Sequence, residues 1–345
     1  MTPWMIYGAN GYTGRLCARM AKQRGLKPIL AGRNAAELEK LAKELGFESR
    51  AFGLEAIDLE GIKAVLHCAG PFSATAKPML DACLAAGAHY LDITGEIPVF
   101  EAIHARNAEI EQKGIVAIPG VGFDVVPTDC LAAMLKEKLP TATHLRLAFR
   151  SRQGQLSPGT TKTMLEGLPE GGKVRRDGRI VTVPAGYKVE TIAFTQERSY
   201  TAITIPWGDV ATAYYSTGIP NIEVFLGASE NQIKRMKLPA WATWLLGKKP
   251  VQAFLKRQVS KRVKGPDEKE RAADEMLVYG EASDEAGAKA VLRLRTPAGY
   301  SLTADAAVTA TGKVLEGKLA PGAYTPSMAF GAQFVLGLEG VKLTG

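Results

Sequence analysis

Cysteine and histidine are scarce in this sequence, which has four of each. No two cysteines have the CxxC spacing, and no histidines have the HxxxH or HExxH spacing of common metal sites. We therefore expect buried, reduced thiols, with neither a disulfide framework nor a bound metal ion. The cysteines are Cys17, Cys68, Cys83 and Cys130.

Long apolar runs are also missing. The longest stretch without a charged residue, 319–338, contains glycine, proline, serine and glutamine, which makes it a poor transmembrane helix. No basic leader with an apolar region precedes the first apolar run at Trp4. These absences predict a cytoplasmic protein.

Acidic residues are absent from 231–266, which carries ten lysines and arginines. The whole chain has a net charge of +8, so the remaining residues sum to −2. Because the positive charge is local, we expect no nucleic-acid partner.

Three interpretations of this basic segment stay open. Its apolar residues, which include Trp241, Trp244 and Phe254, could belong to the core of a domain. Alternatively, the segment could lie on an anionic membrane surface, as a peripheral contact. The third interpretation is a docking surface for an acidic carrier protein that bears an acyl substrate.

The length of 345 residues suits two domains. Short apolar strands alternate with amphipathic helices in the first third, which predicts a parallel sheet covered on both faces. We expect α/β architecture: a Rossmann doubly wound sheet in residues 1–125. The expected strands are 4–7, 28–31, 64–68, 89–93 and 115–118, and the expected helices are 14–24, 35–45, 77–86 and 98–113.

The pattern changes after Pro127. We expect a second α+β domain with a largely antiparallel sheet over 126–318, and a C-terminal segment, 319–345, that packs back near the first domain. The expected strands are 144–150, 199–205 and 222–228, with hairpins over 174–183 and 276–296 and helices at 129–138 and 303–316.

A glycine motif, GxxGxxG, follows the first strand and opens the first helix. Glycines permit a tight turn, a close approach of backbone to pyrophosphate, and close packing of helix on strand. The positive end of the helix would then hold the phosphates. The predicted cofactor residues here are Gly8, Asn10, Gly11, Tyr12, Thr13 and Gly14.

The second strand ends at Gly32-Arg33-Asn34, where an enzyme that prefers NAD usually has an acidic residue. The Arg33 guanidinium could bind a 2′-phosphate and stack on adenine, so we expect NADP rather than NAD. The alternative is an arginine at the start of a surface helix.

Three later loops follow the carboxyl ends of strands, where ligands bind in open α/β sheets. Ala69-Gly70-Pro71-Phe72 completes the predicted cofactor site, although an ordinary strand-to-helix turn fits these residues nearly as well. Glu96 and Asp129 could equally be helix caps. The candidate substrate residues are Glu96, Phe123, Asp124, Thr128, Asp129 and Thr160.

The sequence resembles the saccharopine dehydrogenase-like oxidoreductases, and within them the trans-acting enoyl reductases. The resemblance spans most of the chain. It rests on 8–14, 31–33, 69–72, 92–96, 122–124 and 127–129, and later on 157–166, 206–209, 216–220, 324–326 and 330–331.

The resemblance implies a Rossmann domain, a substrate-binding α+β domain and a homodimer. It also implies hydride transfer from NADPH to an acyl, enoyl or related carbonyl substrate, which could be lipid-like or carrier-bound. No tyrosine has a lysine four residues later, which excludes the short-chain dehydrogenase mechanism, and the proton donor stays unassigned. Two alternatives are a saccharopine-type amino-acid or imine dehydrogenase and a non-catalytic dinucleotide sensor or scaffold.

Overall fold

The computed structural model describes residues 2–152, 161, 167, 170–236, 245–262 and 265–344. Two compact units emerge, and neither is one continuous stretch of chain. The first contains 1–126 and 300–331, and the second contains 127–299 and 332–345. Thr160, Trp241 and Trp244, which the sequence singled out, lie outside the described residues.

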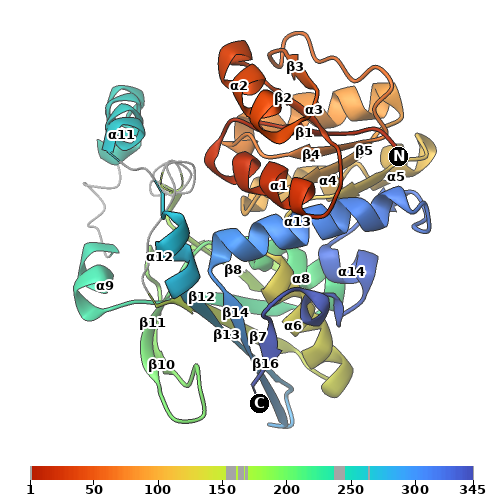
Figure 1. The fold of residues 1–345 in the computed structure, drawn as a ribbon. Helices are drawn as coiled ribbons and strands as arrows, with labels where there is room; N and C mark the ends of the chain where they lie inside the picture. Colours follow the sequence, from red (N-terminus) through yellow and green to blue (C-terminus); the bar gives the residue numbers. More distant parts are fainter. Residues whose placement is uncertain are drawn as a thin grey trace. The chain divides into compact units, whose positions relative to one another are not determined.

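A parallel sheet of seven strands forms the centre of the first unit, in the order β15-β6-β5-β4-β1-β2-β3 (Figure 1). The order reverses beside β1, as in the predicted Rossmann fold, which is confirmed. The strands are β1 Trp4–Tyr7, β2 Ile29–Gly32, β3 Ser49–Ala51, β4 Ala64–His67, β5 His89–Asp92, β6 Val116–Ile118 and β15 Gly322–Ala323.

Helices pack on both faces of this sheet. One face forms a core with α3 to α5, in which strand residues such as Met5 and Tyr90 are fully buried. On α1, the buried side is made of small residues, including Gly14 and Ala18, which let the helix lie close to β1. The helices are α1 Tyr12–Gln23, α2 Ala35–Leu45, α3 Phe72–Ala86, α4 Ile97–His104 and α5 Asn107–Gln112.

The first unit is completed by residues from the far end of the sequence, which differs from the expected boundaries. We placed 300–318 in the second domain, but α13 (Gly299–Leu315) joins the first unit. Polar contacts hold α13 in this unit. Arg24 forms an ion pair with Asp305 and donates a hydrogen bond to the Thr309 hydroxyl. The Phe123 amide donates to the Thr303 hydroxyl at 2.9 Å. β15 then pairs with β6, also in parallel.

The second unit contains a mixed sheet in the order β10-β11-β12-β7-β13-β14-β16, with the hairpin β8–β9 beside β12. Of its described strand pairs, β7 with β12 is parallel and the others are antiparallel, so the predicted largely antiparallel sheet is confirmed. The strands are β7 His144–Ser151, β8 Gly172–Arg176, β9 Arg179–Val183, β10 Val189–Ile192, β11 Tyr200–Thr204, β12 Asn221–Gly227, β13 Glu275–Ser283, β14 Lys289–Pro297 and β16 Lys342–Leu343.

Both predicted hairpins are present. Asp177 and Gly178 join β8 to β9 with φ angles of 48° and 76°, the paired positive values of a type I′ turn. The helices of this unit are α6 Val126–Lys138, α8 Asp209–Thr217, α9 Glu230–Met236, α11 Lys249–Arg262 and α12 Glu268–Ala273. Leu131 and Leu135 of α6 fill the space beside Gly280 of β13.

The tail divides between the units. α14 (Pro326–Phe330) belongs to the first, whereas the 3₁₀ turn Phe334–Gly337 and β16 belong to the second because β16 pairs with β14. All four cysteines are free, and Cys68 alone among them is only half-buried. None of the helices in the described part of the chain is both long enough and apolar enough to cross a bilayer.

Candidate dinucleotide-binding site

The glycine loop lies at the carboxyl edge of the first sheet, between β1 and α1. Gly8 has a φ of +81°, and its amide and that of Ala9 both donate to the Ala31 carbonyl oxygen, at 2.8 and 3.1 Å. A Cβ on Gly8 would lie 2.8 Å from the Cβ of Ala69. The loop therefore fits between β2 and the loop after β4 only because residue 8 has no side chain.

Gly11 and Gly14 bring the helix close to this loop. A Cβ on Gly14 would lie 2.2 Å from the Gly8 carbonyl oxygen, and one on Gly11 would lie 3.1 Å from the same atom. These distances leave the first turn of α1 directly against the loop backbone. A ligand at this edge therefore meets amide groups rather than side chains, as a pyrophosphate requires.

Four helices of the first unit begin at this edge, after β1, β2, β4 and β5, and their N-termini differ. α4 has no side-chain cap among the described contacts. α2 is capped by the Asn34 side chain, and α3 by a carboxylate described below. α1 begins after Gly11, and no side chain in the described part of the chain caps it. The N-terminus of α1 therefore keeps its positive end available for an anion.

The loop after β2 holds the predicted residues for the adenosine end. Arg33 is exposed and forms no ion pair with any described residue. Its neighbour Asn34 has a structural role, since Oδ1 accepts the amide of Glu37 at 3.3 Å. Asn10 lies across from them, with its Oδ1 3.0 Å from where a Cβ on Gly32 would be. Arg33 and Asn10 are thus the side chains there that suit a ligand.

The remaining two loop residues, Tyr12 and Thr13, are half-buried. The Tyr12 ring packs edge-on against Tyr300 of α13, with centroids 5.0 Å apart. This contact ties the start of α1 to the returning helix.

The loop Ala69 to Phe72 lies beside Gly8 and contains a cis peptide bond between Gly70 and Pro71. Thr75 fastens it from within α3, because its hydroxyl donates to the Ala69 carbonyl oxygen at 2.7 Å. Cys68 follows β4, and its amide donates to the Tyr7 carbonyl oxygen at 2.8 Å. This loop therefore packs directly against Gly8 and forms one wall beside the glycine loop.

His67 is fully buried under this wall and packs against the rings of Tyr7 and Phe72. Burial lowers its pKa from 6.5 to about 3, so the imidazole is neutral at physiological pH. The Thr75 hydroxyl donates its proton to the Ala69 carbonyl oxygen. In the 2.9 Å hydrogen bond between His67 Nε2 and the Thr75 hydroxyl, Nε2 is therefore protonated and is the donor. The histidine is a structural part of the wall.

Glu96 caps a helix, but not the one that its position in the sequence suggests. Its two carboxylate oxygens accept the amides of Phe72 and Ser73, at 2.9 and 2.7 Å. It precedes α4, yet among the described contacts its side chain makes no cap bond to that helix. Glu96 therefore satisfies the N-terminus of α3, and this contact favours a positioning role over substrate binding.

Asp92 links the ends of β5 and β6. Its carboxylate accepts the Tyr90 hydroxyl at 2.6 Å and the amides of Thr94 and Gly120 at 2.9 Å each. The side chain is fully buried, and burial raises its pKa to about 6 despite these hydrogen bonds. The sequence placed it in a motif but gave no signal of this cross-strand role.

Asp124 follows β6 at the same edge. One of its oxygens lies 3.0 Å from where a Cβ on Gly95 would be, so the two loops touch because residue 95 is glycine. Burial raises the pKa of Asp124 from 3.8 to about 7. The adjacent Phe123 is buried, and its amide is engaged by Thr303. Of these two candidates, Asp124 has the ionisable side chain and could therefore transfer a proton.

The other substrate candidates are Thr128, Asp129 and Thr160. Thr128 and Asp129 belong to the first turn of α6, in the second unit, and both side chains are buried. Thr160 lies outside the described residues. Glu96, Phe123 and Asp124 therefore belong to the first unit, and Thr128 and Asp129 belong to the second.

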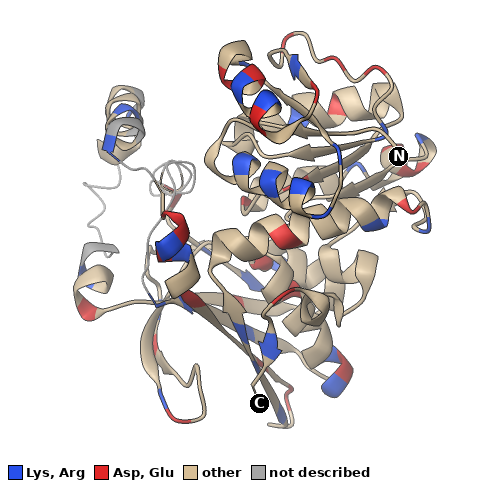
Figure 2. Ribbon diagram, in the orientation of Figure 1, with Lys and Arg blue, Asp and Glu red and all other residues tan. Residues whose placement is uncertain are grey.

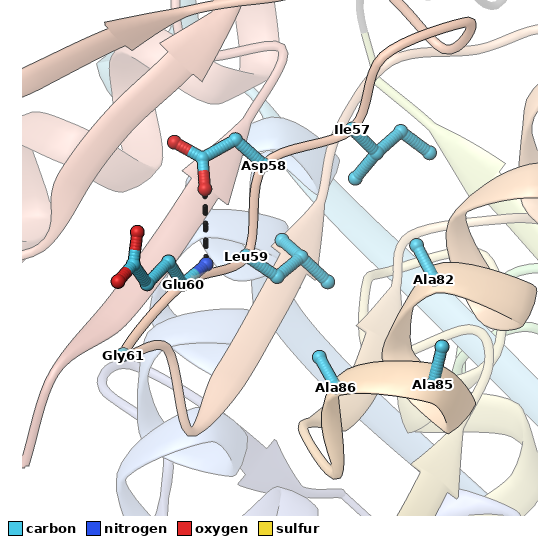
Figure 3. A pocket seen from close by; sticks show the side chains of 8 residues that line it. All are labelled: Ile57, Asp58, Leu59, Glu60, Gly61, Ala82, Ala85 and Ala86. Carbon is cyan, nitrogen blue, oxygen red and sulfur yellow. Dashed lines mark hydrogen bonds between the residues drawn. The ribbon is translucent and has the colours of Figure 1, made fainter.

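A shallow hollow lies away from this edge. It has a volume of about 480 Å³ and lies between the 57–61 loop and the C-terminal turn of α3, near the amino ends of the strands. Figure 3 shows alanines of α3 facing Ile57 and Leu59, with Asp58 accepting the Glu60 amide. Its lining includes Asp58, which pairs with Arg50, and Glu60, and carboxylates are poor partners for a dinucleotide phosphate.

Comparisons with known proteins match most of the first unit to an NADP-binding domain. The family described as "Saccharopine dehydrogenase NADP binding domain" matches residues 4–118. A protein named "Saccharopine dehydrogenase-like oxidoreductase" from Mus musculus is 27% identical over 202 residues, which cover 50% of this chain and 47% of that protein. A "Trans-acting enoyl reductase" from Mycobacterium bovis is 30% identical over 138 residues, covering 36% and 33%.

The matched stretches thus span less than half the length of these relatives. Among solved structures, apo saccharopine dehydrogenase (L-Glu forming) from Saccharomyces cerevisiae superposes with a TM-score of 0.66 over 100% of both chains, at 12% identity. That likeness concerns the fold alone. The chain's resemblance to the saccharopine dehydrogenase-like oxidoreductases is thus confirmed, with residues 4–118 matching the NADP-binding domain of saccharopine dehydrogenase.

Proposed function

We propose that this protein is an NADP-dependent oxidoreductase that transfers hydride to an acyl, enoyl or related carbonyl substrate. The observation that carries the proposal is the glycine loop, where a Cβ at Gly8 or Gly14 would meet neighbouring atoms at 2.8 and 2.2 Å. A loop so closely packed on an uncapped helix suits a dinucleotide pyrophosphate. The relatives named as oxidoreductase and enoyl reductase support the reaction class.

Each part of the edge has a role in this proposal. The amides at the start of α1 bind the pyrophosphate, and the Arg33 guanidinium binds the 2′-phosphate with paired, charge-assisted hydrogen bonds. The wall at Ala69 to Phe72, held by Glu96 and Thr75, limits where the dinucleotide can lie. NADPH supplies the hydride when bound.

Reduction also requires a proton, and Asp124 is our candidate donor. With a pKa near 7, its carboxyl carries the proton on about half of the molecules at neutral pH. Glu96 is a weaker candidate, since both of its oxygens accept backbone amides. A donor at the end of β6 lies on the far side of β1 from Arg33, where a dinucleotide that crosses the sheet edge would place its nicotinamide.

Truncation of Arg33 tests the cofactor assignment. In fluorescence titrations, Arg33→Ala should weaken NADPH binding about tenfold to a hundredfold, the cost of losing hydrogen bonds between charged groups. NADH affinity should change little, because NADH has no 2′-phosphate. Arg19→Ala, which removes an exposed arginine of α1 that pairs with Glu44, is the matched control. Equal losses for NADPH and NADH would contradict the phosphate-binding role.

The reaction itself is tested by NADPH oxidation, followed by absorbance, with a panel of probes. We expect turnover with short enoyl or acyl thioesters. Turnover only with a keto acid plus an amine would instead assign an imine dehydrogenase. Tight NADPH binding with no oxidation by any probe would contradict an enzymatic role and favour a dinucleotide sensor.

A further inference from the structure

A second feature, unrelated to the dinucleotide edge, is the basic segment 231–266. The described parts of it include α9 and α11, and the sequence of α11 contains basic residues and no acidic ones (Figure 2). Arg257 and Arg262 are exposed and form no ion pair with any described residue. This part of the protein therefore presents cations that the fold itself does not neutralise.

Large apolar side chains are exposed beside these cations. Phe254 is 61% exposed and Leu245 is 45% exposed. Phe254 is the most exposed of the large apolar side chains in the described part of the chain. Arg257 follows Phe254 by three residues, so the ring and the guanidinium lie on neighbouring positions of the helix surface.

The apolar side chains of α11 differ in their exposure to solvent. Val251, Leu255 and Val259 recur every four residues, which places them on one face, and all three are half-buried. Phe254 lies outside this row and is 61% exposed, so it does not belong to a buried core of the unit.

We infer that α11, together with Leu245, binds the surface of a membrane that contains anionic phospholipid. Phe254 and Leu245 would enter the boundary between headgroups and acyl chains, and the lysines and arginines would lie among the lipid phosphates. By their positions in the sequence, the basic residues of α11 are spread around the helix and not confined to one face. A fluid anionic surface accepts such a distribution more readily than a shaped protein groove does. A bilayer therefore fits better than an acidic carrier protein.

The test is co-sedimentation of the whole 345-residue chain with vesicles. Binding is expected with phosphatidylcholine mixed with phosphatidylglycerol, and not with phosphatidylcholine alone. It should weaken as salt is added, because screening acts on exposed charges. Equal binding to both vesicles, or none to either, would overturn the inference.

Two variants separate the apolar and the electrostatic contributions. Leu245→Ser with Phe254→Ser should abolish most sedimentation while leaving thermal unfolding unchanged, since both side chains are exposed. Arg257→Glu with Arg262→Glu should weaken vesicle binding at least about tenfold, as expected for cations near an anionic surface.

A matched control distinguishes a local surface from net charge. Lys138→Glu with Arg179→Glu makes the same change in charge at exposed positions of the same unit. It should keep most of the binding, and an equal loss would overturn the assignment to α11. Retained vesicle binding by the Arg257 and Arg262 variant, or displacement of the protein from vesicles by purified acyl carrier protein, would also overturn it.

Discussion

Replacing Gly14 with alanine should destabilise the protein by about 2–3 kcal/mol or more, although alanine is the better helix former. The added Cβ would lie 2.2 Å from the Gly8 carbonyl oxygen and 2.8 Å from Ala9 Cα. Both are backbone atoms of the tight loop, so neither can rotate away. The clash exceeds the gain in helix propensity, which is about 1 kcal/mol. NADPH binding should fall with it, because the loop must move.

Gly312→Ala is the control for this prediction. Gly312 is also inside a helix, α13, and nothing lies within 4 Å of the position that its Cβ would take. We expect no loss of stability and a gain of up to about 1 kcal/mol. Urea unfolding of the three proteins measures the difference. If Gly14→Ala proves as stable as Gly312→Ala, the result would contradict the close approach of α1 to the loop on which this prediction rests.

Replacing Asp92 with alanine is the second change with a large expected effect. It would leave three buried donors, the Tyr90 hydroxyl and the amides of Thr94 and Gly120, without their acceptor. We expect a loss of roughly 3–5 kcal/mol in the free energy of unfolding. That is a large fraction of a typical domain's stability, so the protein should be partly unfolded at physiological temperature. Urea unfolding and near-UV circular dichroism measure it.

Asp92→Asn is the conservative partner and gives a dependence on pH with a definite sign. Burial raises the pKa of Asp92 from its ordinary value of 3.8 to about 6 in the folded protein, so the folded state holds the extra proton between these values. This group therefore stabilises the fold at acid pH and loses that contribution as pH rises through about 6. The stability of the wild type relative to Asp92→Asn should fall by roughly 2 kcal/mol from pH 4.5 to pH 7. No change across that range would contradict the raised pKa.

The elements that carry strong local patterns were predictable. α2 begins at Ala35 and ends at Leu45, as expected, because Asn34 caps one end and Gly46 takes the left-handed conformation at the other. The turn at Asp177-Gly178 follows from residue types that tolerate positive φ. The glycine loop was likewise visible, since its spacing reflects backbone contacts that are local to β1 and α1.

Contacts between distant residues were not predictable. The cap of α3 comes from Glu96, 24 residues beyond Phe72, so no local spacing announces it. α3 was expected over 77–86, whereas the helix begins at Phe72 and includes Pro78 in its interior. β15 has two residues, too few for a strand pattern, and joins its sheet only through β6.

The returning segment of α13 and β15 also affects how the chain can be made. Val116 of β6 pairs with Gly322, so the sheet cannot be completed during translation until nearly the whole chain has left the ribosome. Until then, the nascent dinucleotide-binding unit exposes an unpaired strand edge, which is prone to associate with other chains. A truncated protein ending at 126 would keep that edge permanently, and it would also lack Asp305 for Arg24. The whole chain, or a fusion that restores 300–331, is therefore the appropriate material for studying the cofactor domain.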